Sequence, residues 1–195
     1  MISSVGVTGV VLCGGLGSRF QGRDKPLETL AGKPLVRHVC ERLAPQVAAI
    51  VVSCNRNVDV YARWADRVVL DAHAGRGPLE GVLAGLGAAT TDYVFVCPGD
   101  APLLSERIVA CLAAAVGFRS ADAAVPHDGE RAQHLFMLVR RGIAEHLTDF
   151  LDAGGRAVHA FVDTLDVVTV DMADQRDTFV NLNTVGELAA LEARK

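Results

Sequence analysis

Short hydrophobic runs recur along the chain and alternate with segments of helical spacing. The runs are rich in valine and lack regular polar alternation, which is typical of strands that are buried on both faces of a sheet. The first run ends in glycines, as expected where a strand leads into a loop. The pattern predicts strands over residues 7–12, 48–53, 67–70, 93–97, 123–125, 135–139 and 167–170.

Helix signals fill the segments between these runs. Pro34 can occupy the first helical position, and Leu35, Val39 and Leu43 follow it at helical spacing. Thr184 can cap a last helix that extends to residue 191. Other helices are expected near Tyr61 and Trp64 and over residues 79–89, 106–116, 142–151 and 156–161.

This alternation of strand and helix predicts an α/β fold. We expect a Rossmann-like, mostly parallel sheet covered by helices on both faces, which gives three α/β/α layers. Because no internal repeat or low-complexity tract interrupts the pattern, residues 1–195 are expected to form a single domain. Ligands of such sheets bind beyond the carboxyl ends of the strands, so the segments that follow each strand are the candidates for chemistry.

Composition and charge narrow the function classes. The net charge of −4 argues against a nucleic-acid or membrane partner bound by a basic face, although a few cations and backbone amides suffice for a small polyanion. No run reaches the roughly 20 apolar residues of a membrane span, and no cationic segment precedes the first run as in a secretory signal. The five cysteines have no C-x-x-C spacing and are expected to be reduced thiols of a cytoplasmic protein: Cys13, Cys40, Cys54, Cys97 and Cys111.

The segment after the first strand, residues 12–25, reads L-C-G-G-L-G-S-R-F-Q-G-R-D-K. Arg19 and Lys25 supply the positive charge that a polyphosphate needs. The alternative is a surface loop with two solvated cations, since glycine-rich loops are common. The segment fits neither a Walker A loop nor a dinucleotide fingerprint. Three glycines let backbone amides approach a triphosphate because no Cβ intervenes: Gly14, Gly15 and Gly17.

A second candidate is the turn C-P-G-D-A-P after the strand at residues 93–97. Pro98 and Pro102 stiffen this turn and hold Asp100 at the edge where ligands bind. A fixed carboxylate beside a triphosphate is a suitable Mg²⁺ ligand, because Mg²⁺ takes one or two carboxylates together with phosphate oxygens and water. The alternative is a turn aspartate that bonds its own backbone.

A third candidate, Asp71, follows the strand R-V-V-L. Guanine carries two adjacent donors, N1–H and N2–H₂, which one carboxylate can accept together, so an acidic base pocket favours guanine over adenine and cytosine. Ser53 and Asn55 end the preceding strand and can line the same pocket. The alternative is an exposed aspartate that begins a loop.

Near the C-terminus, the segment F-V-N-L-N-T contains two asparagines. Asn181 and Asn183 share one face of an extended segment, because alternate residues of a strand point the same way. Their amides can contact an acceptor phosphate or the ligands around a metal ion. The alternative is that they form the turn before the last helix, together with Thr184.

These segments together resemble the molybdenum cofactor guanylyltransferases, which belong to the nucleotidyltransferases with the signature L-x-G-G-x-x-x-R-M-G-x-x-K. The resemblance is carried by residues 12–25, by L-A-G-K-P-L-V-R-H-V, G-P-L-E-G and C-P-G-D-A-P, by D-G-E-R-A-Q-H-L-F-M-L-V-R-R and by F-V-N-L-N-T. It spans nearly the whole chain. The first motif and the P-x-D-x-P element are shared by many nucleotidyltransferases, whereas F-V-N-L-N-T and R-A-Q-H-L point to the molybdopterin branch. The chain departs from the family at Ser53, where asparagine is common.

The resemblance implies transfer of GMP from GTP to the terminal phosphate of molybdopterin or its molybdenum form, with release of pyrophosphate. It also implies contact with other proteins of molybdenum cofactor biosynthesis. Arg19, Lys25 and Asp100 become the catalytic candidates, and Asp100 the Mg²⁺ ligand. Candidates for nucleotide binding are Leu12, Cys13, Gly14, Gly15, Lys25, Ser53, Asp71 and Asp100, and for the acceptor Asn181 and Asn183.

Two other function classes stay open at this point. A cytidylyltransferase or a sugar-phosphate nucleotidyltransferase would share the glycine segment and Asp100. A non-catalytic adaptor could bind a nucleotide without turning it over, but Arg19, Lys25 and Asp100 would then have no reason to occur together.

Overall fold

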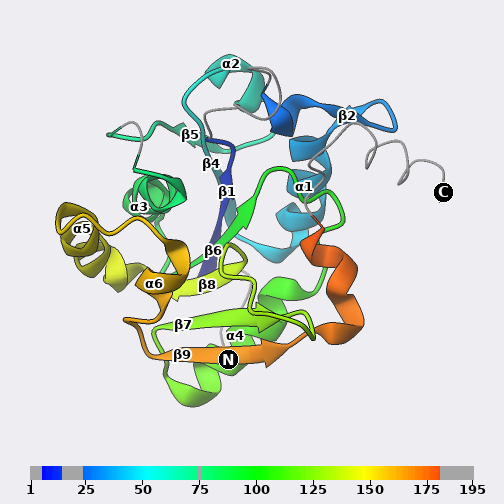
Figure 1. The fold of residues 1–195 in the computed structure, drawn as a ribbon. Coiled ribbons are helices and arrows are strands. Elements are labelled where there is room, and N and C mark those ends of the chain that lie inside the picture. The colour runs from blue at the N-terminus through cyan, green and yellow to red at the C-terminus, as the bar shows by residue number, and fades with distance from the viewer. Residues whose placement is uncertain (1–5, 15–23, 74–75, 181–195) are drawn as a thin grey trace.

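The computed structural model describes residues 6–14, 24–73 and 76–180. Across these ranges, a seven-stranded sheet has the order β5-β4-β1-β6-β8-β7-β9, from the top of Figure 1 to the bottom. Only β8 is antiparallel to its neighbours within it, so the prediction of a mostly parallel sheet is confirmed. The strands are β1 (Val7–Leu12), β4 (Ala49–Ser53), β5 (Arg67–Val69), β6 (Tyr93–Pro98), β7 (Ala123–His127), β8 (Met137–Arg140) and β9 (Val167–Asp171).

Helices cover both faces of this sheet, as expected for three layers. One hydrophobic core lies between the sheet and helices α1 and α4, and a second lies between the sheet and helices α3, α5 and α6 (Figure 1). No helix in the described part of the chain has the length and apolar character needed to cross a bilayer. The α-helices are α1 (Leu35–Leu43), α2 (Val58–Tyr61), α3 (Pro78–Ala88), α4 (Ile108–Arg119), α5 (Ala144–Asp152) and α6 (Val158–Val162). The 3₁₀ helices are η3 (Lys25–Leu27), η4 (Ala44–Gln46), η5 (Arg141–Ile143) and η6 (Ala173–Phe179).

Successive residues of β1 face opposite sides of the sheet and therefore belong to different cores. Val7 and Val11 are buried in the core under α1, whereas Val10 is buried in the core under α3. Glycines bring the helices close to this strand. A Cβ on Gly9 would lie 2.7 Å from Leu43 of α1, so a larger residue would push the helix away. The central strand is therefore packed tightly on both faces.

The short hairpin of β2 (Thr29–Leu30) and β3 (Lys33–Pro34) was not expected from the sequence. Ala31 and Gly32 form its turn with φ values of 50° and 75°, the left-handed conformation that two-residue hairpins need. Strands of two residues are too short to show a period, which is why the pattern did not predict them. Pro34 precedes α1 as its N-cap rather than occupying its first position. The helix expected over residues 184–191 lies outside the described residues.

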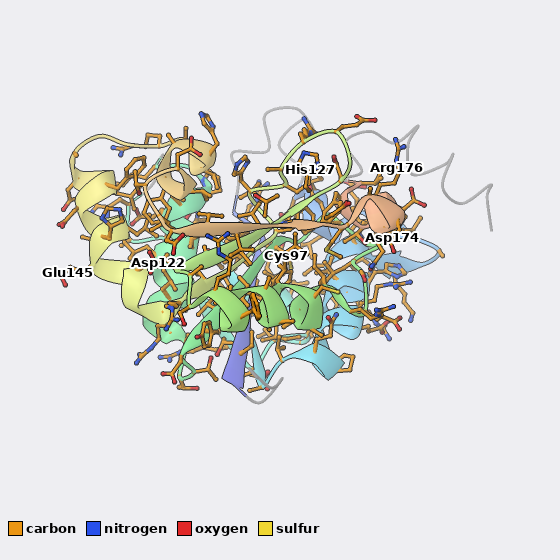
Figure 2. The ribbon with its side chains drawn as sticks, turned by 90° about the horizontal axis from the view of Figure 1, so that it is seen from below. Cys97, Asp122, His127, Glu145, Asp174 and Arg176 are labelled. Carbon is orange, nitrogen blue, oxygen red and sulfur yellow. The ribbon has the colours of Figure 1, made fainter. Side chains whose placement is uncertain are left out.

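The ends of the parallel strands gather at one edge of the sheet. The register pairs Leu12 of β1 with Ser53 of β4 and with Pro98 of β6. Figure 2 shows Asp122 at the amino end of β7 and His127 at the carboxyl end of that strand. The segments that follow the six parallel strands therefore leave the sheet on the same side.

Two glycines of α3 allow a test of this packing. A Cβ on Gly85 would lie 2.6 Å from Val10 Cγ1, whereas a Cβ on Gly87 would have nothing within 4 Å. Gly85→Ala should lower the free energy of unfolding by about 1–3 kcal/mol, because it overpacks the core. The matched Gly87→Ala should raise it by about 0.5 kcal/mol through helix propensity. Urea denaturation measures both, and equal effects of the two substitutions would contradict the packing.

Candidate functional site

An ion pair joins the glycine segment to the turn after β6. The ammonium of Lys25, at the start of η3, contacts Asp100 Oδ2, and the two side chains are 18% and 17% exposed. The other oxygen, Asp100 Oδ1, is buried and accepts no hydrogen bond in the described part of the chain. A buried carboxylate oxygen without a donor is costly, so this atom is suited to bind a cation or a ligand donor.

Close backbone contact holds this turn in place. The N–H of Gly99 donates to the carbonyl of Leu12 at 2.9 Å. A Cβ at position 99 would lie 2.5 Å from Cys13 Sγ and 3.4 Å from Pro26 Cβ, so only glycine fits there without a shift. Asp100 is thereby fixed relative to the first residues of the glycine segment.

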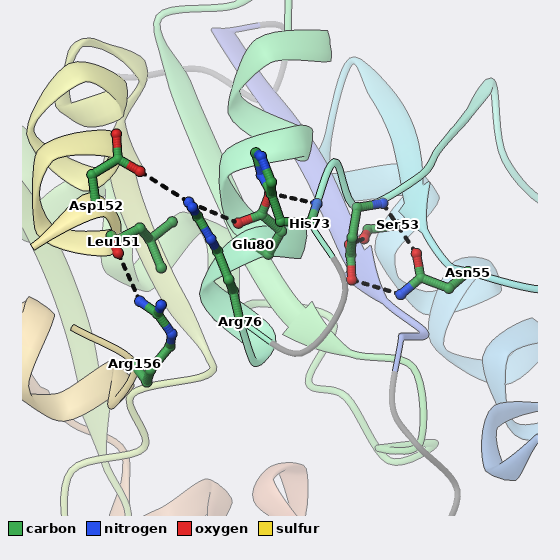
Figure 3. Close-up of polar contacts among 9 residues, drawn as sticks. Ser53, Asn55, His73, Arg76, Glu80, Leu151, Asp152 and Arg156 are labelled. Atoms are coloured by element: carbon green, nitrogen blue, oxygen red, sulfur yellow. Dashed lines mark hydrogen bonds and ion pairs between the residues drawn. The ribbon is translucent and has the colours of Figure 1, made fainter. Parts of the chain in front are cut away.

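A second polar cluster surrounds Asp71. Ser53 Oγ donates to Asp71 Oδ1 at 3.0 Å, and Asn55 Nδ2 donates to Asp71 Oδ2 at 2.6 Å. The N–H of Asp71 returns a hydrogen bond to Asn55 Oδ1 at 3.1 Å, as Figure 3 shows beside the labelled Ser53 and Asn55. A Cβ on Gly14 would lie 3.4 Å from both Asn55 Nδ2 and Asp71 Oδ2. The structure therefore brings together Gly14, Ser53 and Asp71, and each carboxylate oxygen retains capacity for a further donor.

Asp24 is a part of this region that the sequence analysis missed. Its side chain is only 7% exposed, and Asp24 Oδ2 accepts a hydrogen bond from Asn57 Nδ2 at 2.8 Å and lies 3.5 Å from Arg56 Nε. These contacts fix the residue directly before Lys25. Arg56 and Asn57 are 32 and 33 positions away in the sequence, and no local pattern links them to Asp24.

The loop after β7 is held by another aspartate. Asp128 Oδ1 accepts hydrogen bonds from the N–H groups of Glu130 and Arg131, each at 2.8 Å, and Gln133 Nε2 donates to Asp128 Oδ2 at 2.5 Å. The hydrogen bonds from the backbone lower the pKa of Asp128 to about 2. This loop, which belongs to the R-A-Q-H-L segment, therefore has a defined shape at the same edge of the sheet.

The five cysteines are free thiols. Cys13, Cys40, Cys54 and Cys97 are buried, and Cys111 is partly exposed. Burial raises the pKa of Cys40 to about 12 and that of Cys54 to about 11, so both stay protonated at neutral pH. Only a thiolate is a good nucleophile or metal ligand. Residues 6–14, 24–73 and 76–180 also hold no group of three His, Cys, Asp or Glu side chains arranged for a metal.

The other candidates from the sequence analysis are not part of the structural description. Gly15, Gly17 and Arg19 of the glycine segment lie outside the described residues, as do Asn181 and Asn183. Their roles remain predictions.

A three-layer α/β/α fold with Gly14, a lysine and two anchored aspartates at the carboxyl edge of its sheet is the arrangement of a nucleotidyltransferase type of protein. The comparisons with known proteins agree. Residues 9–168 match the model of the MobA-like NTP transferase domain, and the chain belongs to that family.

Relatives of this family align over nearly the whole chain. A protein of Shewanella sp. (strain MR-4) named molybdenum cofactor guanylyltransferase is 39% identical over 191 residues, covering 97% of each chain. One of the same name from Mannheimia succiniciproducens is 38% identical, covering 95% of this chain and 98% of that protein. The fold is similar to that of molybdopterin-guanine dinucleotide biosynthesis protein A from Archaeoglobus fulgidus, with a TM-score of 0.80 at 24% identity, covering 96% and 97% of the two chains.

The thiols provide a test of the buried part of the site. Cys111 should be the one cysteine of the folded protein that reacts rapidly with a thiol reagent at pH 8, because the other four are buried. All five should react once the protein is unfolded in urea. Rapid reaction of Cys13 or Cys97 in the folded protein, located by mass spectrometry, would contradict their burial beneath the site.

Proposed function

We propose that this protein transfers GMP from GTP to the terminal phosphate of molybdopterin or its molybdenum form and releases pyrophosphate. The observation that carries the proposal is the position of two aspartates on either side of β1. Asp71 lies beside Gly14 on the β4 side, and Asp100 lies on the β6 side. Asp71 follows β5 but is bonded to Ser53 at the end of β4. Strands β4 and β6 are two strand spacings apart, about 10 Å, which is close to the length of a nucleoside monophosphate. The base would bind at Asp71 and the phosphates at Asp100.

The residues around Asp100 fit a divalent metal. The buried Asp100 Oδ1, which has no donor among the described residues, is a hard oxygen ligand of the kind that Mg²⁺ prefers. Mg²⁺ needs only one or two protein carboxylates when phosphate oxygens and water complete its coordination. A Mg²⁺ ion bound there would neutralise charge on the α-phosphate and on the leaving pyrophosphate. We infer that Asp100 is its ligand.

The chain's own residues would bind and align the two substrates. The acceptor phosphate is already an anion at neutral pH, since its second pKa is about 6, so the reaction needs no strong general base. Lys25 and Arg19 would hold phosphate oxygens, and the amides of Gly14 and Gly15 would approach the same group. Catalysis would then come from alignment of the acceptor oxygen with the α-phosphate and from charge neutralisation.

The acceptor side and the setting of the reaction are part of the same proposal. Asn181 and Asn183 would contact the acceptor. The free cysteines suit a reducing compartment, and we infer that residues 1–195 act as one domain in the cytoplasm. Other proteins of molybdenum cofactor biosynthesis would supply the acceptor and receive the product.

Asp100 provides the test of the metal site. Asp100→Asn should remove most turnover, measured as pyrophosphate released from GTP with the pterin acceptor, because the amide is a poor Mg²⁺ ligand. Asp66→Asn is the matched control. Asp66 directly precedes β5 and accepts the N–H of Ile50 of β4 at the amino edge of the sheet, away from the site, so this variant should keep activity. Equal activity of Asp100→Asn and the parent across a Mg²⁺ titration would rule out the metal assignment.

Asp71 provides the test of base choice. A site built to accept the donors of guanine rejects bases that lack them. Each charge-assisted hydrogen bond contributes about 1.5–3 kcal/mol, so Asp71→Ala should lower kcat/KM for GTP roughly ten- to hundredfold. For ITP, which lacks N2–H₂, the substitution should lower kcat/KM by a smaller factor. The assay compares GTP, ITP, ATP and CTP on both proteins at saturating acceptor; unchanged ratios would mean that Asp71 does not contact the base, and preference for CTP would favour a cytidylyltransferase.

A further inference from the structure

A buried glutamate lies close to the proposed base pocket. Glu80 belongs to the first turn of α3, in the segment G-P-L-E-G, and its side chain is only 2% exposed. The residues on either side of it, Leu79 and Gly81, are buried as well. A carboxylate at such a position is expensive unless it is paired, so its partners indicate what it holds.

Both oxygens of Glu80 face the segment that follows Asp71. The N–H of His73 donates to Glu80 Oε1 at 3.1 Å, and His73 Nδ1 lies 3.0 Å from the same oxygen. Glu80 Oε2 has Arg76 Nη1 at 4.0 Å and accepts no hydrogen bond in the described ranges. Arg76 in turn donates to Asp152 Oδ1 of α5 at 3.0 Å (Figure 3). One buried carboxylate thus contacts both His73 and Arg76.

These contacts complete a set of supports around Asp71. On one side, Ser53 and Asn55 hold the carboxylate of Asp71 itself. On the other side, Glu80 holds the backbone two positions further on, at His73. The same helix turn also supports Ser53, since a Cβ on Gly81 would lie 2.7 Å from Ser53 Oγ. The start of α3 therefore lies against Ser53 on one side of Asp71 and holds His73 on the other.

We propose that Glu80 is a positioning residue for base recognition: it anchors the segment after Asp71 so that the carboxylate of Asp71 faces the guanine edge. The inference rests on the proposed role of Asp71. Glu80 touches neither substrate in this scheme, and it acts through its two contacts with His73, one to the backbone N–H and one to Nδ1 of the imidazole.

The variant Glu80→Gln removes the negative charge of the side chain and keeps its size. Glutamine has one acceptor oxygen, and its amide donors must face either the N–H of His73 or the guanidinium of Arg76, which are donors themselves. In either orientation the buried amide of the glutamine faces another donor and lacks an acceptor, so the segment at His73 should shift.

The experiment measures equilibrium binding of GTP and ATP, each with Mg²⁺, to the full-length protein by calorimetry. Glu80→Gln should raise the Kd of GTP about tenfold, the effect of one lost charge-assisted hydrogen bond, while the Kd of ATP changes little. In the background of Asp71→Ala, Glu80→Gln should cause no further loss of GTP affinity, because the two residues act on the same contact. If Glu80 only stabilised the fold, Glu80→Gln would weaken GTP binding by the same factor in the parent and in Asp71→Ala.

Gln46 offers a matched control. It is a buried polar residue on the other face of the sheet, where Gln46 Nε2 donates to the carbonyls of Arg42 and Ser105, and Gln46 Oε1 accepts the N–H of Val109. Gln46→Ala should lower the melting temperature but leave the ratio of the two Kd values as in the parent. Should Glu80→Gln not fold, His73→Ala replaces it, because that side chain is 60% exposed, and it should lower the preference for GTP about threefold.

The outcomes separate this inference from the proposed function. A parent protein that binds GTP and ATP alike would overturn the guanine assignment and, with it, the role of Glu80. A parent that prefers GTP, together with a Glu80→Gln variant that keeps the same preference, would overturn the role of Glu80 alone. Additive losses in the double variant would make Glu80 a structural residue.

Discussion

The pairing of β1 with β4 on one side and β6 on the other constrains everything else in the candidate site. Both pairs are parallel, and their register sets Leu12 beside Ser53 and Pro98. The three segments that follow must therefore leave the sheet at the same level, and backbone bonds such as Gly99 N–H to Leu12 O extend the pairing by a further residue. Side chains from distant parts of the chain meet there because the strand ends coincide.

The strands could be predicted because burial on both faces leaves a clear mark in the sequence, and the mostly parallel direction followed from their alternation with helices. The run at residues 7–12 matches β1, and most other runs differ from the observed strands by one or two residues. The antiparallel direction of β8 has no such mark, since a buried strand reads the same in either direction. The hairpin of β2 and β3 depends on the turn at Ala31 and Gly32, and an alanine there gives no turn signal.

The same distinction applies to the site. Lys25, Asp71 and Asp100 follow strands or a glycine segment, so their positions relative to local elements pointed to them. The supports of these residues are contacts that form only when the chain folds, and no spacing reveals them. Asp24 with Asn57 and Glu80 with His73 are examples, because each is a buried or half-buried carboxylate whose partner is known only once the chain has folded. Sequence patterns thus identify the candidates for ligand contact more readily than the residues that position them.

The charge distribution explains how an acidic chain could hold a polyanion. The net charge is −4, and both aspartates of the proposed pocket would repel a triphosphate if they acted as free anions. Their neighbours remove that conflict. Asp71 is bonded by the neutral donors of Ser53 and Asn55 at the end where an uncharged base would bind. Asp100, at the phosphate end, contacts Lys25, and a divalent cation on its second oxygen would turn the carboxylate from a repulsive group into part of a cationic one. The opposite requirements of base and phosphate would thus be met by two aspartates whose surroundings differ.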